Sequence, residues 1–259
     1  MPYPKLRIFA GPNGSGKSTI IKAVREYRTS AGRPLELGKY VNADDIVQIL
    51  VSDGSFKLAP FKVSKSKNTF HAFVRCSGLI RDKFTWNVFE SCHNFHRSGI
   101  TMADGCTRGT IEALAQVLAA YLVEELMTAG RSLSFETVFS HESKLQTMRH
   151  ATENGYRVYL YFVATESPII NIGRVANRVK MGGHAVPEGL ITSRYHRSLG
   201  LLHSAVEASY HSYLFDNSRE QSRMFAKYRS EVKSRWEVDL EDMPNWFYTH
   251  YIRKLKPTG

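Results

Sequence analysis

The chain is poor in cysteine, and it has no apolar segment long enough to cross a membrane. Its three cysteines, Cys76, Cys92 and Cys106, are odd in number and widely spaced. Such a set is a poor framework for disulfide bonds, so we expect reduced thiols. The first residues show neither the basic start nor the apolar stretch of a signal peptide. These absences argue against a disulfide-rich secreted protein and an integral membrane protein, and they predict a cytoplasmic protein with no membrane partner.

Acidic residues are also scarce relative to basic ones. The sequence has 35 Lys and Arg against 24 Asp and Glu, which gives a formal net charge of +11. This balance indicates an anionic partner, either nucleic acid or the phosphates of a smaller ligand, or else a generally basic surface. Apart from a group between Arg174 and Arg197, the basic residues are spread along the chain. Because there is no tight basic run and no aromatic–basic stacking motif, nucleic acid is an alternative that we do not favour.

Short apolar runs alternate with segments of helical period. The runs that predict strands are residues 6–10, 39–42, 132–135, 157–163 and 213–215. The segments that predict helices are residues 18–27, 43–51, 110–127 and 142–153, a helix from Pro168, and another from Pro187 to about 210. This alternation predicts an α/β fold, a three-layer sandwich whose mostly parallel, five-stranded sheet has helices on both faces. We expect one domain over residues 1–259, with mixed helix and tail after residue 218.

Residues 52–108 have no clean period. They hold all three cysteines and many Phe, Ser and Lys residues, and we predict an irregular or helical segment inserted over the core. Within it, Cys92, His93 and His96 raise the question of a zinc site. Structural zinc ligands come in close pairs from two places, and this segment does not have that spacing. Buried thiols and ordinary histidines are therefore the better interpretation.

The most informative segment follows the first predicted strand. Residues 11–18 fit the pattern G-x-x-x-x-G-K-[ST], in the order Gly11, Pro12, Asn13, Gly14, Ser15, Gly16, Lys17 and Ser18. Glycines let the backbone curl so that successive N–H groups point at one anion, and the helix N-terminus that follows favours negative charge. In this pattern the lysine reaches the β- and γ-phosphates of ATP, and the serine binds Mg²⁺. The position between a strand and an amphipathic helix predicts a phosphate-binding loop that extends to Thr19.

Carboxylate-bearing residues follow two other predicted strands. Asp44 and Asp45 come after the second strand, and Glu136 comes at the end of the third. The carboxyl ends of strands in open α/β sheets line the ligand crevice. A carboxylate there accepts a proton from a hydroxyl acceptor or holds Mg²⁺ through water. An equal alternative is an Asx N-cap for the next helix, because Asp and Asn favour that position. One aspartate could then be the cap while the other takes the catalytic role. For Glu136 the alternative is an exposed loop carboxylate.

Arginines gather in a predicted lid over about residues 168–199. Arg174 and Arg178 are four residues apart and share a helix face. Phosphoryl transfer builds negative charge on the γ-phosphoryl oxygens, and arginines on a lid neutralise it. The glycines at 182–183 supply a hinge. A solvated basic face is the alternative, weakened by three further basic residues, His184, Arg194 and Arg197.

Beyond the phosphate loop, a series of motifs resembles the zeta-toxin family of P-loop kinases, and more specifically its stand-alone chromosomal branch. The motifs occur in order across most of residues 6–218. They are AGPNGSGKST at 10–19, VNADDI at 41–46, FETVFS at 135–140, GYRVYLYFV at 155–163, RVANRVKMGGHAVPEGLITSRYHRSL at 174–199 and DNS at 216–218. Only the first is generic, and the set as a whole is fairly specific.

The resemblance implies ATP-dependent phosphorylation of a sugar hydroxyl, with UDP-N-acetylglucosamine as the acceptor known for the toxins. Carried over by motif, Lys17 holds the phosphates and Ser18 holds Mg²⁺. Asp44 is the general base on the acceptor hydroxyl, and Glu136 and Thr137 contact the acceptor. The carboxylate of Asp44 or that of Glu136 would also reach Mg²⁺ through water.

The resemblance extends to the lid and to the rest of the nucleotide. It implies that Arg178, with Arg174 as the alternative, stabilises the transferring phosphoryl group. His184 matches the lid segment of the family, and we group it with the acceptor residues. Asn217 and Ser218 are implied to lie near the adenine of ATP.

Other acceptors and functions remain as alternatives. The segment at 52–108 is longer than the family pattern leads us to expect, and we predict that it lies over the acceptor site and shapes its pocket. NAD or another nucleotide is therefore an alternative acceptor. A polynucleotide or RNA kinase and a non-catalytic ATP-binding protein are alternative functions. The toxins of the family pair with a small antitoxin, which makes such a protein a candidate partner.

Overall fold

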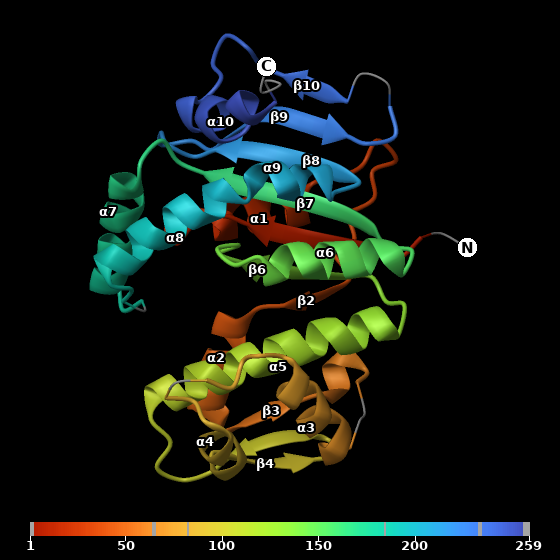
Figure 1. The fold of residues 1–259 in the computed structure, drawn as a ribbon, viewed down its shortest axis with the longest axis vertical. Helices are drawn as coiled ribbons and strands as arrows, with labels where there is room; N and C mark the ends of the chain where they lie inside the picture. The colour runs from red at the N-terminus through yellow and green to blue at the C-terminus, as the bar shows by residue number, and fades with distance from the viewer. Residues whose placement is uncertain (1–2, 64–65, 82, 184, 233–234, 256–259) are drawn as a thin grey trace. The chain divides into compact units, whose positions relative to one another are not determined.

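The computed structural model describes residues 3–63, 66–81, 83–183, 185–232 and 235–255. It divides into two compact units, the first comprising Met1–Gly38 and Glu136–Gly259 and the second comprising Lys39–Phe135. Figure 1 labels the elements of both units along the chain. The boundary falls inside strand β6 (Leu133–Thr137), whose last two residues belong to the first unit.

The sheet of the first unit is built from apolar strands. These strands are β1 (Lys5–Ala10), β7 (Arg157–Ala164), β8 (His211–Asp216), β9 (Arg223–Arg229) and β10 (Trp236–Val238). Their order is β10-β9-β8-β7-β1. The central strands β1, β7 and β8 run parallel, which fits strands that are buried on both faces. β9 pairs antiparallel with β8, and β10 pairs antiparallel with β9.

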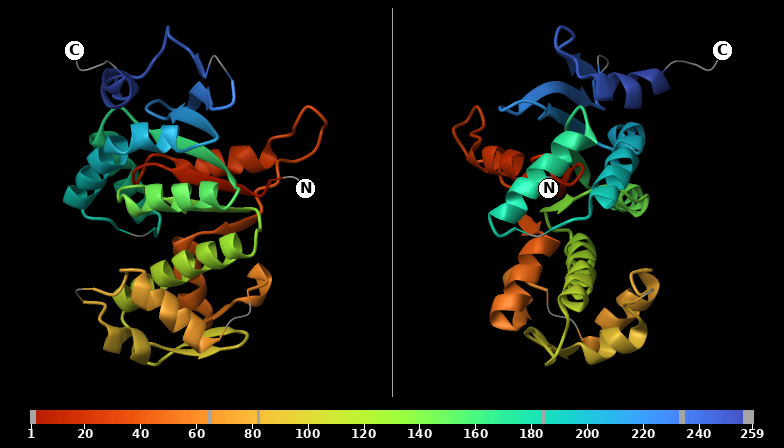
Figure 2. Two further views of the ribbon diagram at one scale, coloured as in Figure 1. Left: turned by 45° about the vertical axis from the view of Figure 1, so that its right-hand side comes forward. Right: turned by 90° about the vertical axis from the view of Figure 1, so that its left-hand side faces the viewer.

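Helices lie on both faces of this sheet. They are α1 (Lys17–Glu26), α6 (Ser143–Glu153), α7 (Pro168–Lys180), α8 (Glu188–Gly200), α9 (Leu202–Glu207), α10 (Asn245–His250) and the 3₁₀ turn η2 (Ile252–Lys254). Figure 2 shows α1 on one face of the sheet and α6, α8 and α9 on the other. Strand side chains such as Leu6, Ile8 and Leu160 are fully buried. Their removal from water holds the layers together.

All five predicted strands are present, and the α/β class with a mostly parallel sheet is confirmed. The prediction of mixed helix and tail after residue 218 holds for α10 and η2 but misses β9 and β10, which extend the sheet beyond the five strands predicted. In β9, buried Ala226 and Tyr228 alternate with the more exposed Lys227 and Arg229. This period of two is the sequence signal of a strand. Among the described helices, none is long and apolar enough to cross a membrane.

The second unit holds the region whose sequence has no clean period. Its elements are β2 (Lys39–Val41), α2 (Ala43–Asp53), β3 (Ser55–Lys57), the 3₁₀ turn η1 (Ala59–Phe61), α3 (Lys67–Cys76), α4 (Trp86–Ser91), β4 (His93–His96), β5 (Gly99–Met102) and α5 (Arg108–Thr128). β2 pairs in parallel with the first part of β6. β3, β5 and β4 form a separate antiparallel sheet. The prediction of an irregular or helical segment at 52–108 is therefore wrong at these strands.

Close pairing in the small sheet depends on one glycine. Gly99 lies opposite Lys57, and a Cβ atom at Gly99 would come 2.1 Å from the carbonyl oxygen of Phe56. Only glycine permits this approach of two backbones. The strands are only three or four residues long, which explains why no alternation is visible in the sequence.

An aromatic core holds the second unit together. Phe70, Phe89 and Tyr121 are completely buried, and the ring of Phe70 contacts those of Phe89 and Tyr121 at centroid distances of 5.6 and 4.9 Å. At the edge of this core, the guanidinium of Arg75 lies 3.8 Å from the centre of the partly buried Trp86 ring. Aromatic burial and cation–π contacts of this kind stabilise a small core strongly for its size.

The cysteines and histidines of the second unit do not gather into a metal site. In the part of the chain that the structure describes, no group of three His, Cys, Asp or Glu side chains could hold a metal ion. Cys76, Cys92 and Cys106 are free thiols. Burial raises the pKa of Cys92 to about 12, so that thiol stays protonated and unreactive.

His93 should make the stability of the protein depend on pH. The residue is 6% exposed and packs against Phe89 at 4.8 Å between ring centroids, and burial lowers the pKa of His93 from 6.5 to about 4. The folded state therefore keeps the ring neutral, whereas the unfolded chain takes up a proton below about pH 6.5. The contribution of the neutral His93 to the free energy of unfolding is therefore fully present above about pH 6.5 and is lost as the pH falls toward 4. We expect the free energy of unfolding to fall by about 2 kcal/mol between pH 7 and pH 5 on this account.

Denaturant unfolding at the two pH values measures the loss. His93→Gln removes the titrating ring and should abolish most of the difference, whereas His96→Gln, at an exposed position of the same strand, should leave it unchanged. An equal loss in the unaltered protein and in His93→Gln would show that other groups cause the pH dependence.

Candidate functional site

The loop between β1 and α1 forms a tight cradle of backbone. Gly11 and Gly16 have φ values of 144° and 92°, in a region that favours glycine. A Cβ atom at Gly11 would lie 2.0 Å from the carbonyl oxygen of Val163, and one at Gly16 would lie 2.0 Å from Nδ2 of Asn217. The two glycines are therefore needed because other segments of the first unit press closely against the loop.

Helix α1 begins inside this cradle. Its N-cap residue is Gly16, which makes no side-chain cap hydrogen bond, and the N–H groups of Thr19 and Ile20 donate to the carbonyl oxygen of Gly16. Ser18 and Thr19 are exposed in that turn. Unpaired N–H groups together with the helix dipole favour an anion at such a position. The cradle thus fits the phosphate groups of a nucleotide.

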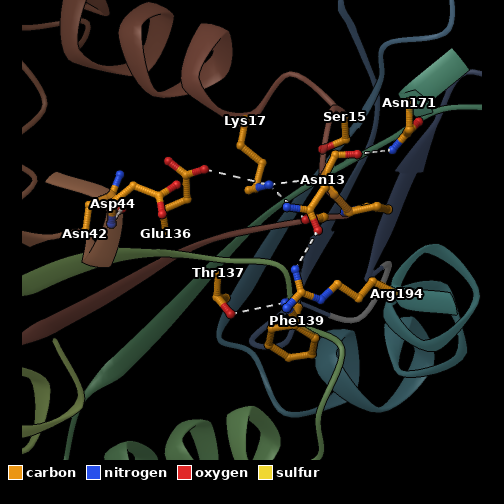
Figure 3. A network of polar contacts seen from close by, with 12 residues as sticks. Asn13, Ser15, Lys17, Asn42, Asp44, Glu136, Thr137, Phe139, Asn171 and Arg194 are labelled. Atoms are coloured by element: carbon orange, nitrogen blue, oxygen red, sulfur yellow. Dashed lines mark hydrogen bonds and ion pairs between the residues drawn. The ribbon is translucent and has the colours of Figure 1, made fainter. Parts of the chain in front are cut away.

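Lys17 folds back over the loop that precedes it. Its Nζ atom donates hydrogen bonds to the carbonyl oxygens of Gly11 and Pro12, both at 3.0 Å, and lies 3.7 Å from Oε1 of Glu136. Figure 3 shows the ammonium between the loop and this carboxylate. The Lys17 side chain is only 8% exposed, so the ammonium is largely removed from water and depends on these partners. The structure therefore brings two of the predicted residues, Lys17 and Glu136, into contact.

Three side chains from later elements hold the loop in place. Nδ2 of Asn217, directly after β8, donates to the carbonyl oxygen of Ser15 at 2.8 Å. Nδ2 of Asn171, in α7, donates to the carbonyl oxygen of Asn13 at 2.6 Å. Nη1 of Arg194, in α8, donates to Oδ1 of the same Asn13 at 3.2 Å. Figure 3 shows Asn171 and Arg194 approaching Asn13 from different sides, so two helices of the predicted lid region are tied to the phosphate loop.

Two buried hydroxyl groups orient Asn171. The hydroxyl of the fully buried Thr165 donates to Oδ1 of Asn171, and the hydroxyl of Tyr195 donates to the carbonyl oxygen of Thr165 at 2.6 Å. Burial raises the pKa of Tyr195, and the carboxylates of Glu166 and Asp216 raise it further. Tyr195 therefore stays a neutral donor. With its oxygen fixed by Thr165, the amide of Asn171 must direct its NH₂ group toward the loop.

Asn217 and Ser218 have structural partners within the first unit. Asn217 holds Ser15, while the hydroxyl of Ser218 accepts a hydrogen bond from the backbone N–H of Glu166 at 2.9 Å and donates to Oδ1 of Asp216 at 2.7 Å. These contacts join the end of β8 to the segment that precedes α7. The placement of both residues near an adenine stays a prediction.

The end of β6 carries Glu136 and Thr137. Oγ1 of Thr137 accepts a hydrogen bond from the backbone N–H of Phe139 at 3.1 Å, and in Figure 3 the Thr137 side chain points toward Arg194. Phe139 is fully buried and has a φ of 56°, a left-handed conformation that is unfavourable for a bulky residue. Backbone strain of this kind concentrates at functional sites, which supports a functional role for this turn.

In the second unit, Asn42 and not an aspartate caps helix α2. Oδ1 of Asn42 accepts a hydrogen bond from the backbone N–H of Asp44 at 2.9 Å. Asp44 and Asp45 occupy the first turn of the helix, and both are exposed. The N-cap of the helix is therefore an Asx residue, but it is Asn42 and not one of the two aspartates.

The lid region contains the predicted helix and glycine turn. Nη2 of Arg174 donates to the carbonyl oxygen of Arg219 at 3.2 Å, while its Nη1 is buried without a partner. Arg178 is exposed near the end of α7. The N–H of Gly183 donates to the carbonyl oxygen of Arg178 at 2.9 Å, which closes the end of the helix. His184 lies outside the described residues.

The sequence-based predictions do not identify the residues that support the loop as its supports, and they place Asn217 near the adenine instead. Arg194 is recognised only as one member of a basic group, and Asn171, Thr165 and Tyr195 are not singled out. One signal was available, because Asn171 and Val175 are four residues apart and both are buried in α7. A polar residue in the apolar stripe of a helix has to find an internal hydrogen bond.

Comparisons with known proteins agree with this geometry. No protein-family model matches the chain. A chain in the crystal structure of AvrRxo1-ORF1:AvrRxo1-ORF2 with sulphate ions has a TM-score of 0.56 and 13% identity, over 92% of this chain and 61% of that chain. A chain in the structure of the same two proteins with ATP has a TM-score of 0.56 and 15% identity, over 99% of this chain and 66% of that chain. The chain therefore shares its fold with these two solved chains.

The coverage of these two solved chains is partial. This chain spans 61% and 66% of the two solved chains. An uncharacterized protein of Haemophilus influenzae is 38% identical over 60 residues, which make up 23% of this chain and 43% of that protein. The α/β fold that the motifs lead us to expect is thus shared with these solved chains.

Loss of the Asn171 amide should loosen the loop between β1 and α1. Asn171→Ala leaves the carbonyl of Asn13 and the hydroxyl of Thr165 without their partner, at a cost of about 1–3 kcal/mol in the free energy of unfolding. We expect a lower melting temperature and an affinity for ATP reduced about tenfold, measured by calorimetry. Asn177→Ala, at an exposed position of the same helix, is the matched control and should change neither quantity. Equal behaviour of the two variants would exclude Asn171 as a support of the loop.

Proposed function

We propose that the protein transfers the γ-phosphoryl group of ATP to a hydroxyl group of a small molecule in a reaction that requires Mg²⁺. The observation that carries the proposal is the environment of Lys17, whose ammonium is buried between the carbonyls of the loop and the carboxylate of Glu136. A phosphate cradle, a lysine and a nearby carboxylate are groups that phosphoryl transfer uses for positioning and charge stabilisation. The fold shared with a structure solved with ATP supports the choice of nucleotide.

On the phosphate side, the residues of the loop and of α1 bind the nucleotide. The Lys17 ammonium would move from the carbonyls of Gly11 and Pro12 to the β- and γ-phosphate oxygens, and backbone N–H groups at the start of α1 would add donors. Ser18 would hold Mg²⁺, and the carboxylate of Asp44 or Glu136 would reach the ion through water. When bound, Mg²⁺ neutralises charge on the phosphate oxygens.

On the acceptor side, Asp44 is our candidate for the general base. The motif resemblance assigns it this role, and its exposed carboxylate is not used as a helix cap. It would take the proton of the acceptor hydroxyl as that oxygen forms its bond to the γ-phosphorus and ADP leaves. Glu136 and Thr137 would contact the acceptor and hold it in line with the bond that breaks.

Positive charge for the transferring group would come from the lid region. Arg178 is our first assignment and Arg174 the second, with His184 in the same segment. Arg194 joins them in this proposal because it already reaches the loop through Asn13. Arginine suits this role, since its guanidinium stays charged and presents several donors in one plane.

We propose a nucleotide sugar such as UDP-N-acetylglucosamine as the acceptor, on the strength of the motif resemblance. ATP consumption with a panel of nucleotide sugars, NAD, nucleosides and short RNA tests this choice. Phosphorylated RNA, with binding that weakens steeply as salt increases, would indicate a polynucleotide kinase instead. Tight binding of ATP without any phosphorylated acceptor would indicate a non-catalytic ATP-binding protein.

We further propose a protein partner of the antitoxin type and a cytoplasmic location. The two solved structures with this fold contain AvrRxo1-ORF1 together with AvrRxo1-ORF2, which supports a search for a second protein. The free thiols and the use of ATP fit a reducing cytoplasm.

Removal of the Asp44 carboxylate should abolish transfer while leaving the nucleotide site intact. We expect Asp44→Asn to lower kcat about 10²–10⁴-fold, the range of a lost general base, and to leave the affinity for ATP within about twofold. Asp45→Asn, one position further in the same exposed turn, is the matched control and should keep most of the activity. Full activity in Asp44→Asn would overturn the assignment of the base.

The lid arginines can be ranked by the same assay. Arg178→Ala should lower kcat by about 10²-fold or more if its charge reaches the transferring group. Arg197→Ala removes an exposed arginine from α8 and should have little effect. If Arg174→Ala lowers kcat and Arg178→Ala does not, Arg174 is the residue that stabilises the transferring phosphoryl group.

A further inference from the structure

Two rows of side chains cross one face of the sheet in the first unit. In the first row, four residues lie opposite one another on β1, β7, β8 and β9, namely Arg7, Tyr159, His211 and Arg229. The second row contains Phe9, Tyr161, Tyr213 and Lys227. On the parallel strands β1, β7 and β8 its residues come two positions after those of the first row, and on the antiparallel β9 two positions before. Residues opposite in register share a face of the sheet, so this face is aromatic and basic.

Arg7 is buried in the first row without a counter-charge. The residue is 2% exposed, and its Nε and Nη1 atoms are buried with no hydrogen-bond partner. Its guanidinium lies 5.2 Å from the centre of the Tyr159 ring, and Tyr161 lies two residues further along the same face of β7. No carboxylate of the described residues forms an ion pair with it. Since arginine stays charged at any pH a protein meets, burial of this group is costly until an anion compensates it.

His211, in the same row, adds a further buried nitrogen without a partner. Its Nδ1 atom is unpaired, while its Nε2 atom lies 2.5 Å from Oε1 of Glu231. The imidazole lies 5.4 Å from the ring of Tyr159, between ring centroids. Arg7 and His211 thus flank Tyr159 in one row, and each has polar atoms that nothing among the described residues satisfies.

The other cations of this face have carboxylate partners. Arg229 forms an ion pair with Glu237, and Nζ of Lys227 lies 4.0 Å from Oε2 of the same residue. The basic character of the whole protein therefore does not explain Arg7. Arg7 lacks a carboxylate partner among the described residues, although the neighbouring cations of the same face have one.

We propose that Arg7 is the centre of an oxyanion-binding site on this sheet face, which takes a small molecule with a carboxylate or a phosphate group. The guanidinium supplies the charge and two donor nitrogens without partners, Nε and Nη1, and Tyr161 in the neighbouring row carries a further hydroxyl donor. Tyr159, His211 and Tyr213 are only partly buried and form the rim that a ligand displaces. The site is separate from the phosphate loop, because Arg7 lies inside β1 whereas the loop begins after it at Gly11.

Thermal unfolding with added anions tests the site. Lys17→Ala serves as the background so that the phosphate loop binds the probes less well, and malonate and inorganic phosphate are the probes. Chloride at the same ionic strength corrects for general salt effects. We expect a saturable rise in Tm with at least one probe, and Arg7→Met in this background should weaken the apparent affinity about tenfold or more. Malonate and phosphate together distinguish a carboxylate ligand from a phosphorylated one.

Arg229→Met is the matched control, since that arginine lies in the same row but already has a carboxylate partner. It should keep the response to the anion. Equal responses with and without Arg7, or no response in the background protein, would overturn the proposal. If Arg7→Met does not fold, Arg7→Lys keeps a charge and loses the planar donors, and it should show the same weakening. A shift of the Arg7 Nε–H signal in a nitrogen NMR spectrum on addition of the probe is the independent readout.

Discussion

The hydrogen bonds from the Lys17 ammonium to the carbonyl oxygens of Gly11 and Pro12 are the interaction on which the rest of the site depends. A buried ammonium needs oxygen partners, and the loop supplies them by curling back over the start of α1. That curl brings the loop close to Val163 and Asn217, where only glycine fits at positions 11 and 16. The glycines, the lysine and the close approach of other segments are therefore one structural requirement and not three separate ones.

The loop is also hydrogen-bonded to the two helices that follow β7, α7 and α8. Asn13 is held by Asn171 from α7 and by Arg194 from α8. A buried amide has few orientations that satisfy all its atoms, and Thr165 removes the choice for Asn171. A displacement of the loop on binding phosphate would thus displace Asn171 and Arg194, and with them both helices. This coupling gives the lid region a mechanical connection to the nucleotide that does not rely on its arginines.

Much of the fold could be predicted from the sequence because its central strands are nearly continuous apolar runs. The phosphate loop could be predicted because its glycines and lysine have fixed spacing. β9 and β10 were missed, since alternation of Ala226, Lys227, Tyr228 and Arg229 is a weak signal over so few residues. The small sheet of the second unit was missed because its strands are too short to show a period. Asn171 and Thr165 support the site through hydrogen bonds between residues far from the loop in sequence, and no local pattern encodes such contacts.

The contact between Arg75 and Trp86 has a practical consequence. Trp86 is the one tryptophan in the sequence between residues 39 and 135, whereas Trp236 and Trp246 belong to the other unit. The emission of an indole depends on its immediate surroundings, and a guanidinium 3.8 Å from the ring centre gives Trp86 surroundings of its own. A protein in which the other two tryptophans are replaced by phenylalanine would carry an intrinsic optical reporter in one compact unit only. Fluorescence could then follow the second unit separately while ligands are added or the chain is unfolded.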